Sequence, residues 1–243
     1  MRMTTAHEPR YLQVKRPLIE ALRKGRWKHG QKLPSEPQLA QRHGVGVGTV
    51  RRAVGELVAE NILLREQGSG TYVRSHTRDY MLDVFFRIVG RDGRKELPAT
   101  TLLDLRRVRA DAETARRLRL KPRAAVIRID TLLTLRGRPT ILDCMHLPTR
   151  LFPDLGASLF ARRDGTVYGF FQQRYGITVV RAEEFITAIA AGEREASLLG
   201  VPDGTALLRI VRTAYTYKDQ PVDTRIRLVA CGAHGYLSTL GRS

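Results

Sequence analysis

The sequence predicts an α+β protein in two parts: a helical N-terminal part that ends in a short hairpin, and a C-terminal part built on a mainly antiparallel sheet. Residues 33–73 indicate the first part, because a capped helix, a glycine turn, an amphipathic helix and two short strands follow one another there. Beyond residue 80, strand-like runs are interrupted by short helices without the strand–helix rhythm of a parallel sheet. A chain of 243 residues with 42% hydrophobic side chains can build two cores.

The first helix is expected over residues 11–24, after a loose tail at 1–9, and Gly25 follows it as a C-terminal capping residue. Pro17 lies inside this segment. It therefore marks either the first turn of a shorter helix or a kink.

A second helix begins after Ser35 and is predicted to end at Gly44. Ser35 and Gln38 have the spacing of a capping box, in which the hydroxyl accepts from the Gln38 amide and the Gln38 side chain returns to the serine. Pro37 is tolerated because the amides of a first helical turn have no helical partner.

A third helix is expected over 48–60, with an apolar stripe at helical spacing. Small and polar residues lie opposite this stripe, with arginines at the N-terminal end: Gly48, Thr49, Arg51, Arg52 and Glu56. Such a face suits close approach to a DNA groove, although an ordinary solvated helix face has the same composition. The two interpretations are separated only by the neighbouring elements.

Two short strands, 62–66 and 71–73, flank a glycine-rich tip at 67–70. Glycine permits a tight turn with positive φ and lets the backbone approach a phosphate. Helix, turn, helix and hairpin in this order predict a winged helix-turn-helix, in which the second of these two helices enters the major groove.

After a polar linker at 74–80, the second part contains alternating strand and helix signals. Asp111 caps one short helix, and glycines end the other two. The expected strands are 81–89, 101–109, 125–135, 140–146, 178–190, 206–217 and 222–231, and the expected helices are 112–119, 166–175 and 193–199.

The net charge of +18 and pI of about 10.8 favour a polyanionic partner. Residues 1–77 hold 14 basic and 6 acidic side chains, so the excess is denser there but is not confined there. A solvated charge typical of an arginine-rich proteome is the alternative. Two cysteines, the lack of an apolar signal core and the short apolar runs indicate a reduced, cytoplasmic protein without a membrane partner.

The segments LPSE (33–36), GVGVGTVRRAV (44–54), AENIL (59–63) and QGSGTYV (67–73) resemble the GntR family of bacterial transcription regulators. LFPDL (151–155), TVYGFFQQRYGI (166–177), LLGVPDGTALLRIVRTAY (198–215) and QPVD (220–223) resemble the UTRA effector domain of its HutC subfamily. The resemblance implies a winged helix at 1–76 and a chorismate-lyase-like effector domain at 80–243. It also implies a homodimer, a repressor that binds a two-fold symmetric operator in double-stranded DNA, and a small metabolite that changes operator affinity, without a cofactor.

The DNA-binding pattern departs from the family at two positions, because Pro37 and Val47 replace arginines that help contact the operator. Each bidentate guanine contact is worth about 1–3 kcal/mol of discrimination, so a different operator is expected. The residues expected to bind DNA are Lys32, Ser35, Thr49, Arg51, Arg52, Gln67, Gly68, Ser69 and Gly70.

The effector domain departs from relatives that bind sugar phosphates, because Thr131 and Leu133 replace an arginine pair. A hydroxyl and an aliphatic side chain cannot clamp a phosphate. We therefore expect a less charged or amine-bearing ligand, held by Asp143 and Asp223. The full set of expected effector-binding residues is Arg87, Thr131, Leu133, Asp143, Thr166 and Asp223.

An enzyme is the least favoured alternative, since the histidines are scattered and no catalytic motif occurs. Similarity to a lyase fold does not carry activity. A lyase for a dianionic substrate would need convergent arginines, for which the candidates are Arg87, Arg128, Arg181, Arg225 and Arg227. A sequence-indifferent DNA binder is the other alternative, favoured by the high charge and by the two missing arginines.

Overall fold

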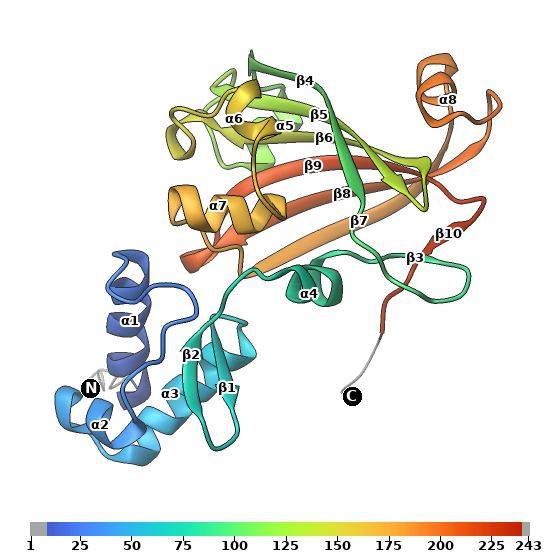
Figure 1. The fold of residues 1–243 in the computed structure, drawn as a ribbon. Helices are drawn as coiled ribbons and strands as arrows, with labels where there is room; N and C mark the ends of the chain where they lie inside the picture. The colour runs from blue at the N-terminus through green and yellow to red at the C-terminus, as the bar shows by residue number, and fades with distance from the viewer. Residues whose placement is uncertain (1–8, 240–243) are drawn as a thin grey trace, which may run out of the picture. The chain divides into compact units, whose positions relative to one another are not determined.

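The computed structural model describes residues 9–239, which form two compact units whose boundary in the chain falls between Ser75 and His76 (Figure 1). All of the expected N-terminal tail except Pro9 lies outside the described residues.

The first unit has three described helices and a two-stranded antiparallel hairpin (Figure 1). Its core is formed by aliphatic side chains such as Val14, Val50 and Leu57, all fully buried. The elements are α1 (Arg10–Arg23), α2 (Glu36–His43), α3 (Val47–Ala59), β1 (Leu63–Glu66) and β2 (Gly70–Val73).

Local signals account for most of these boundaries. The capping box at Ser35 and Gln38 is present, and Gly44 ends α2 in the left-handed conformation with φ 61°. The helix α1 continues through Pro17, so the first-turn interpretation of this proline is wrong.

The second unit is built on a six-stranded sheet in which every neighbouring pair is antiparallel. The strand order is β4-β5-β6-β9-β8-β7, which confirms the predicted α+β class. The strands are β4 (Ala99–Arg109), β5 (Ala125–Leu135), β6 (Arg138–Pro148), β7 (Arg181–Ala190), β8 (Ala206–Thr216) and β9 (Gln220–Ala230). A separate pair joins β3 (Ile88–Gly90) to β10 (His234–Tyr236).

Helices cover both faces of this sheet (Figure 1). On one face, α6 (Ala157–Ala161) and α7 (Val167–Tyr175) pack their aromatic side chains onto β5 and β6. On the other face, α5 (Ala112–Arg117) and α8 (Glu193–Leu199) bury smaller clusters. The largest core therefore lies between the sheet and α7.

The expected strand over 81–89 is wrong for most of its length. Thr77 caps a short helix, α4 (Arg78–Tyr80), which continues as a π-helical turn over Met81–Phe85 before β3 begins. The Thr77 hydroxyl accepts a hydrogen bond from the Tyr80 amide, which starts a helix where apolar composition alone suggests a strand. Tyr80 and Phe85 are buried in the largest core.

Candidate functional site

The first unit exposes the N-terminal half of α3. The side chains of Arg51 and Arg52 are 67% and 66% exposed, and Thr49 is half-buried beside them. Gly46 precedes this helix in an extended conformation and supplies no side-chain cap. The surface is therefore basic and contains small residues, as the sequence predicts.

Arg51 is held in one orientation by Glu36, at the start of α2. Its Nε donates to Glu36 Oε2 over 3.0 Å, and Arg65 Nη2 donates to Glu36 Oε1 over 2.8 Å. Within residues 9–239, no hydrogen bond engages the two terminal nitrogens of Arg51. A guanidinium fixed at Nε keeps those nitrogens for a bidentate partner such as the edge of a guanine.

Glu36 and Arg65 were missed as functional residues by the sequence reasoning. Glu36 directly follows the helix cap and Arg65 lies in the first wing strand, so only the fold brings both to Arg51. A carboxylate in the first turn of a helix is already explained by its favourable interaction with the helix dipole. The sequence therefore offers no reason to expect that Glu36 also binds Arg51.

Arg52 lies in a different environment from Arg51. Its guanidinium carbon lies 4.1 Å from the ring centre of Tyr11 on α1, and its Nε lies 3.8 Å from Glu56 Oε1. Stacking on an aromatic face stabilises an arginine in place. Arg52 is thus engaged with α1, unlike Arg51.

The wing tip approaches Lys32 closely. Lys32 forms an isolated antiparallel bridge with Tyr72, and a Cβ added to Gly70 would lie 2.7 Å from Lys32 Cε. Gly70 also has φ 132°, which side chains avoid. The groove between this tip and the start of α2 is lined by Trp27, Gln31, Lys32, Leu33, Pro34, Ser35, Glu36, Pro37, Gln38, Arg42, Arg65, Glu66, Gln67, Gly68, Ser69, Gly70 and Thr71.

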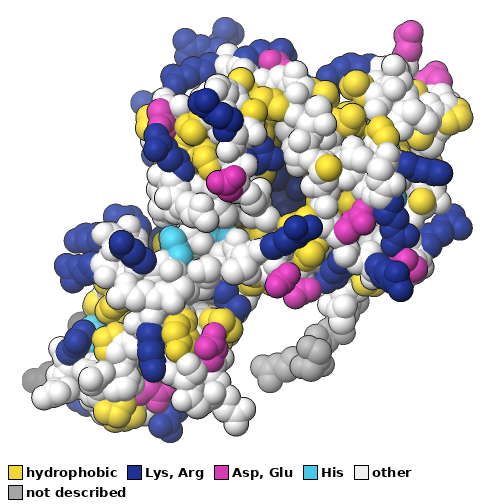
Figure 2. Space-filling view, in the orientation of Figure 1, with side chains coloured by type: hydrophobic (Ala, Val, Ile, Leu, Met, Phe, Trp, Pro, Cys, Tyr) yellow, Lys and Arg dark blue, Asp and Glu magenta, His cyan; other side chains and the backbone are white. Residues whose placement is uncertain are grey.

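The second unit encloses a cavity of about 610 Å³ between the sheet and α7. Figure 2 shows a hollow on this unit with dark blue basic side chains inside it. Such a volume suits a small metabolite. Four of the expected effector residues line the cavity, namely Thr131, Leu133, Asp143 and Thr166, whereas Arg87 and Asp223 are absent from its lining.

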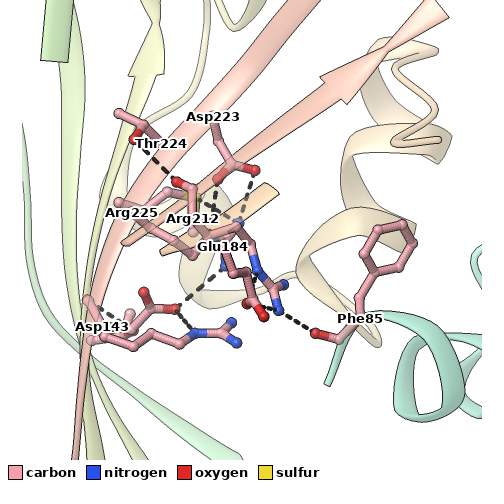
Figure 3. Close-up of polar contacts among 10 residues, drawn as sticks. Phe85, Asp143, Glu184, Arg212, Asp223, Thr224 and Arg225 are labelled. Atoms are coloured by element: carbon pink, nitrogen blue, oxygen red, sulfur yellow. Dashed lines mark hydrogen bonds and ion pairs between the residues drawn. The ribbon is translucent and has the colours of Figure 1, made fainter. Parts of the chain in front are cut away.

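Three buried arginines on β8 and β9, called the floor of the cavity below, line it: Arg212, Arg225 and Arg227. Figure 3 shows Arg212 and Arg225 with their carboxylate partners. Arg212 pairs with Glu184 over 2.6 Å and donates to the Phe85 carbonyl oxygen. Arg225 makes a bidentate pair with Asp223, at 2.9 and 3.0 Å, and also reaches Asp143 Oδ2 over 3.4 Å. These pairs compensate charges that would otherwise be costly to bury.

Arg227 is the least satisfied of the three. Its Nε donates to Asp143 Oδ2 over 3.3 Å, while no hydrogen bond engages its terminal nitrogens within the described part of the chain. Burial lowers the pKa of Arg227, and the neighbouring Arg212 and Arg225 lower it further, although Asp143 opposes them. Asp143 is therefore the carboxylate that stabilises the charge of Arg227.

Among residues 9–239, Asp143 Oδ1 and the Tyr168 hydroxyl also lack a hydrogen-bond partner, and both residues line the same cavity. Burial raises the pKa of Tyr168 to about 12, so this hydroxyl keeps its proton. Sequence reasoning missed Tyr168 and Arg212, because a tyrosine in a helix and an arginine in a strand are common outside binding sites.

The chain enters the second unit along the wall of the cavity, because His76 and Thr77 both line it. The backbone amide of His76 donates to Gln172 Oε1 over 2.9 Å, and its ring Nε2 donates to the Val179 carbonyl oxygen over 2.7 Å. His76 is 6% exposed. This first segment of the unit is thus fixed to α7 and to the segment before β7.

Comparison with known families assigns both units. Residues 10–73 match the model described as bacterial regulatory proteins, gntR family, and residues 93–230 match the UTRA domain. The second match alone covers more than half of the chain. The protein belongs to the GntR family and carries a UTRA domain.

Relatives of this GntR regulator match it along most of their length. The HTH-type transcriptional regulator YurK of Bacillus subtilis is 28% identical over 88% of both chains. The histidine utilization repressor of Pseudomonas putida is 28% identical over 93% of this chain and 89% of its own. The ligand-binding domain of a GntR-family regulator from Bordetella bronchiseptica is 34% identical, with a TM-score of 0.61, over 64% of this chain and 96% of that domain.

Membership makes this GntR protein a transcriptional regulator rather than an enzyme, with DNA binding in the first domain and effector binding in the UTRA domain. In residues 9–239, no helix is long and apolar enough to cross a membrane. The same residues contain no cluster of three or more side chains suited to hold a metal ion.

Proposed function

We propose that this regulator is a homodimeric repressor that binds a two-fold symmetric operator through residues 1–76 and is controlled by a small metabolite bound within residues 80–243. One relative carries the name of a repressor, which supports this direction of control. A metabolite that binds one dimer conformation better shifts the population toward it, and changes the spacing or mobility of the two winged helices.

The observation that carries the DNA-reading part is the exposed, oriented guanidinium of Arg51. Its Nε is held by Glu36, and its terminal nitrogens remain for a base edge. Thr49 and Arg52 lie on the same helix, with Arg52 nearer to α1. Lys32, Ser35 and the tip residues Gln67, Gly68, Ser69 and Gly70 line the adjacent groove, and we propose that they hold phosphates.

The experiment is operator binding by the Arg51→Ala variant. Selection of binding sites from random duplex gives the operator, and fluorescence anisotropy gives the affinity for operator and for scrambled duplex. We expect the variant to lose at least about fivefold in operator affinity, because a bidentate base contact is worth about 1–3 kcal/mol. Affinity for scrambled duplex should change much less.

A matched control is Arg94→Ala, which removes an 85% exposed arginine from the second unit and changes the net charge equally. Unchanged operator affinity in Arg51→Ala would refute the assignment of α3 to the groove. Equal affinity of the native protein for operator and scrambled duplex, with a steep salt dependence, would support the sequence-indifferent alternative instead.

A further inference from the structure

The cavity of the second unit offers one free donor pair and one free acceptor side by side. Asp143 on β6 and Arg227 on β9 are direct partners in the sheet register, and Arg227 Nε lies 3.3 Å from Asp143 Oδ2. In the described chain, no hydrogen bond engages the terminal nitrogens of Arg227 or the second oxygen of Asp143, although the Arg227 guanidinium carbon lies 5.7 Å from the centre of the Phe86 ring. Both side chains are more than nine-tenths buried and line the cavity.

Unpaired polar groups at such depth are costly, so a bound ligand that satisfies them gains affinity. The guanidinium fork of Arg227 is matched in shape by a carboxylate, which accepts two parallel hydrogen bonds. Asp143 Oδ1 needs the opposite kind of partner, an N–H or O–H donor. One ligand can bind both Arg227 and Asp143 Oδ1 only if its N–H or O–H donor is close to its carboxylate.

Resting on the proposed function, we propose that the effector of this cavity is a small carboxylate with a hydroxyl or amino group on the adjacent carbon. Arg227 binds the carboxylate, and Asp143 Oδ1 accepts from the neighbouring hydroxyl or amine. The amine-bearing ligand expected from the sequence becomes one member of this class, with Asp143 as its partner. Asp223 takes no part, because both of its oxygens already accept from Arg225 and it is fully buried.

The charge balance of the floor favours a single negative charge over a phosphate. Arg212 and Arg225 are already paired with Glu184, Asp223 and Asp143, so Arg227 is the arginine of this floor with an unused fork. Thr131 and Leu133, on β5 at the far side of β6, also line the cavity and add no charge. The three arginines already face three carboxylates, so a dianion would bury two uncompensated negative charges, a plain carboxylate one, and an amino acid none, because its ammonium offsets its carboxylate.

The rest of the cavity sets the body of the ligand. Apolar and aromatic side chains form much of its wall, including Met81, Phe85, Phe86, Leu133, Met145 and Phe160. A volume of about 610 Å³ exceeds what a carboxylate and its adjacent group fill. An apolar or aromatic side group on the acid is therefore expected.

The test is calorimetric titration of the full chain with a matched set of probes on one phenyl skeleton. The set comprises 3-phenyllactate, phenylalanine, 3-phenylpropanoate and 3-phenylpropanol, with glucose 6-phosphate and inorganic phosphate as anions of the other class. A second set on a hexyl skeleton, with 2-hydroxyhexanoate, norleucine, hexanoate and hexanol, covers an aliphatic body. We expect the hydroxy or amino acid to bind at least about tenfold tighter than the plain acid, and the alcohol not to bind.

Two variants locate the contacts. Arg227→Gln should remove the preference for acid over alcohol, and it leaves Asp143 paired with Arg225, so the fold is retained. Asp143→Asn should remove the preference for hydroxy or amino acid over plain acid. Arg209→Gln, on the face of β8 opposite to the buried Ile210, is the control and should keep both preferences.

Several outcomes overturn the inference. One is tighter binding of glucose 6-phosphate than of any carboxylate, and another is no binding of any carboxylate in either set at about 10 mM. A preference for the hydroxy or amino acid that survives both variants also overturns it. These outcomes leave the DNA-reading function standing, because that function is tested separately by Arg51→Ala.

Discussion

Glu36 is predicted to be a specificity residue that acts through Arg51 without contacting DNA. In Glu36→Ala, Arg51 and Arg65 lose their 3.0 and 2.8 Å partners. The Arg51 and Arg65 side chains are 67% and 44% exposed, so each pair contributes only about 0.2–1 kcal/mol to stability. The domain should therefore stay folded, with a small decrease in its free energy of unfolding.

The effect on DNA binding should be larger and should differ between sequences. Without Glu36, the Arg51 guanidinium is no longer held in one orientation. The free energy of operator binding should therefore lose much of the ~1–3 kcal/mol of a bidentate base contact. Affinity for scrambled duplex should rise, because a negative charge near the phosphates has been removed. The ratio of operator to scrambled affinity should thus fall about tenfold or more.

Fluorescence anisotropy with both duplexes at two salt concentrations measures this ratio. Glu66→Ala is the matched control, since Glu66 is an exposed carboxylate at the end of the first wing strand. It should raise both affinities about equally and leave the ratio unchanged. If Glu36→Ala also leaves the ratio unchanged, Glu36 does not orient Arg51 for reading.

Three further predictions concern stability, measured by urea denaturation. Arg212→Ala should cost up to about 3–5 kcal/mol, because the largely buried Glu184 loses its cation and keeps the Tyr236 hydroxyl as a donor. Arg181→Ala breaks exposed pairs and should cost less than about 1 kcal/mol. Equal costs would contradict the importance of the Arg212–Glu184 pair. Gly70→Ala should destabilise more than Gly68→Ala, because only Gly70 has both a φ near 132° and a side chain within 2.7 Å of the new Cβ; the reverse order would show that Lys32 moves away freely. Burial lowers the pKa of His146 in the folded protein below its ordinary 6.5. As the pH falls, the unfolded chain therefore binds a proton at this histidine before the folded protein does. The stability contributed by neutral His146 is present above pH 6.5 and is lost as the pH falls through the pKa of the folded state. His146→Gln should flatten the pH dependence there, and an unchanged slope would exclude this histidine as its source.

The sequence predicts the secondary structure of the DNA-binding domain more completely than that of the UTRA domain. Capping at Ser35, the glycine end at Gly44 and the apolar stripe of α3 are local signals, and the structure confirms each of them. The strand β5 has the predicted bounds, 125–135, because a run rich in apolar and β-branched side chains fills it, and most of these side chains are buried. The helical turn at Met81–Phe85 could not be foreseen, since an apolar run of that length fits either a strand or a buried helix.

Contacts between side chains on strands that are far apart in the sequence could not be predicted from the sequence. Asp143 and Arg227 are 84 positions apart and meet only through the β6–β9 register. Arg225 and Arg227 stood out beforehand only as candidate arginines among several, and strand spacing alone could not place them in one cavity. Glu36 likewise takes its second role only when α3 and the wing strand are packed beside it.

His76 and Thr77, which line the cavity, are relevant to how ligand binding could affect the DNA-binding unit. This segment lines the cavity and directly continues the chain of the DNA-binding unit, so an occupant that contacts it acts on the connection between the two units. A ligand that changes the hydrogen bonds of His76 to Gln172 and Val179 would change how firmly the start of the second unit is held. The covalent connection between the two units is the peptide bond between Ser75 and His76.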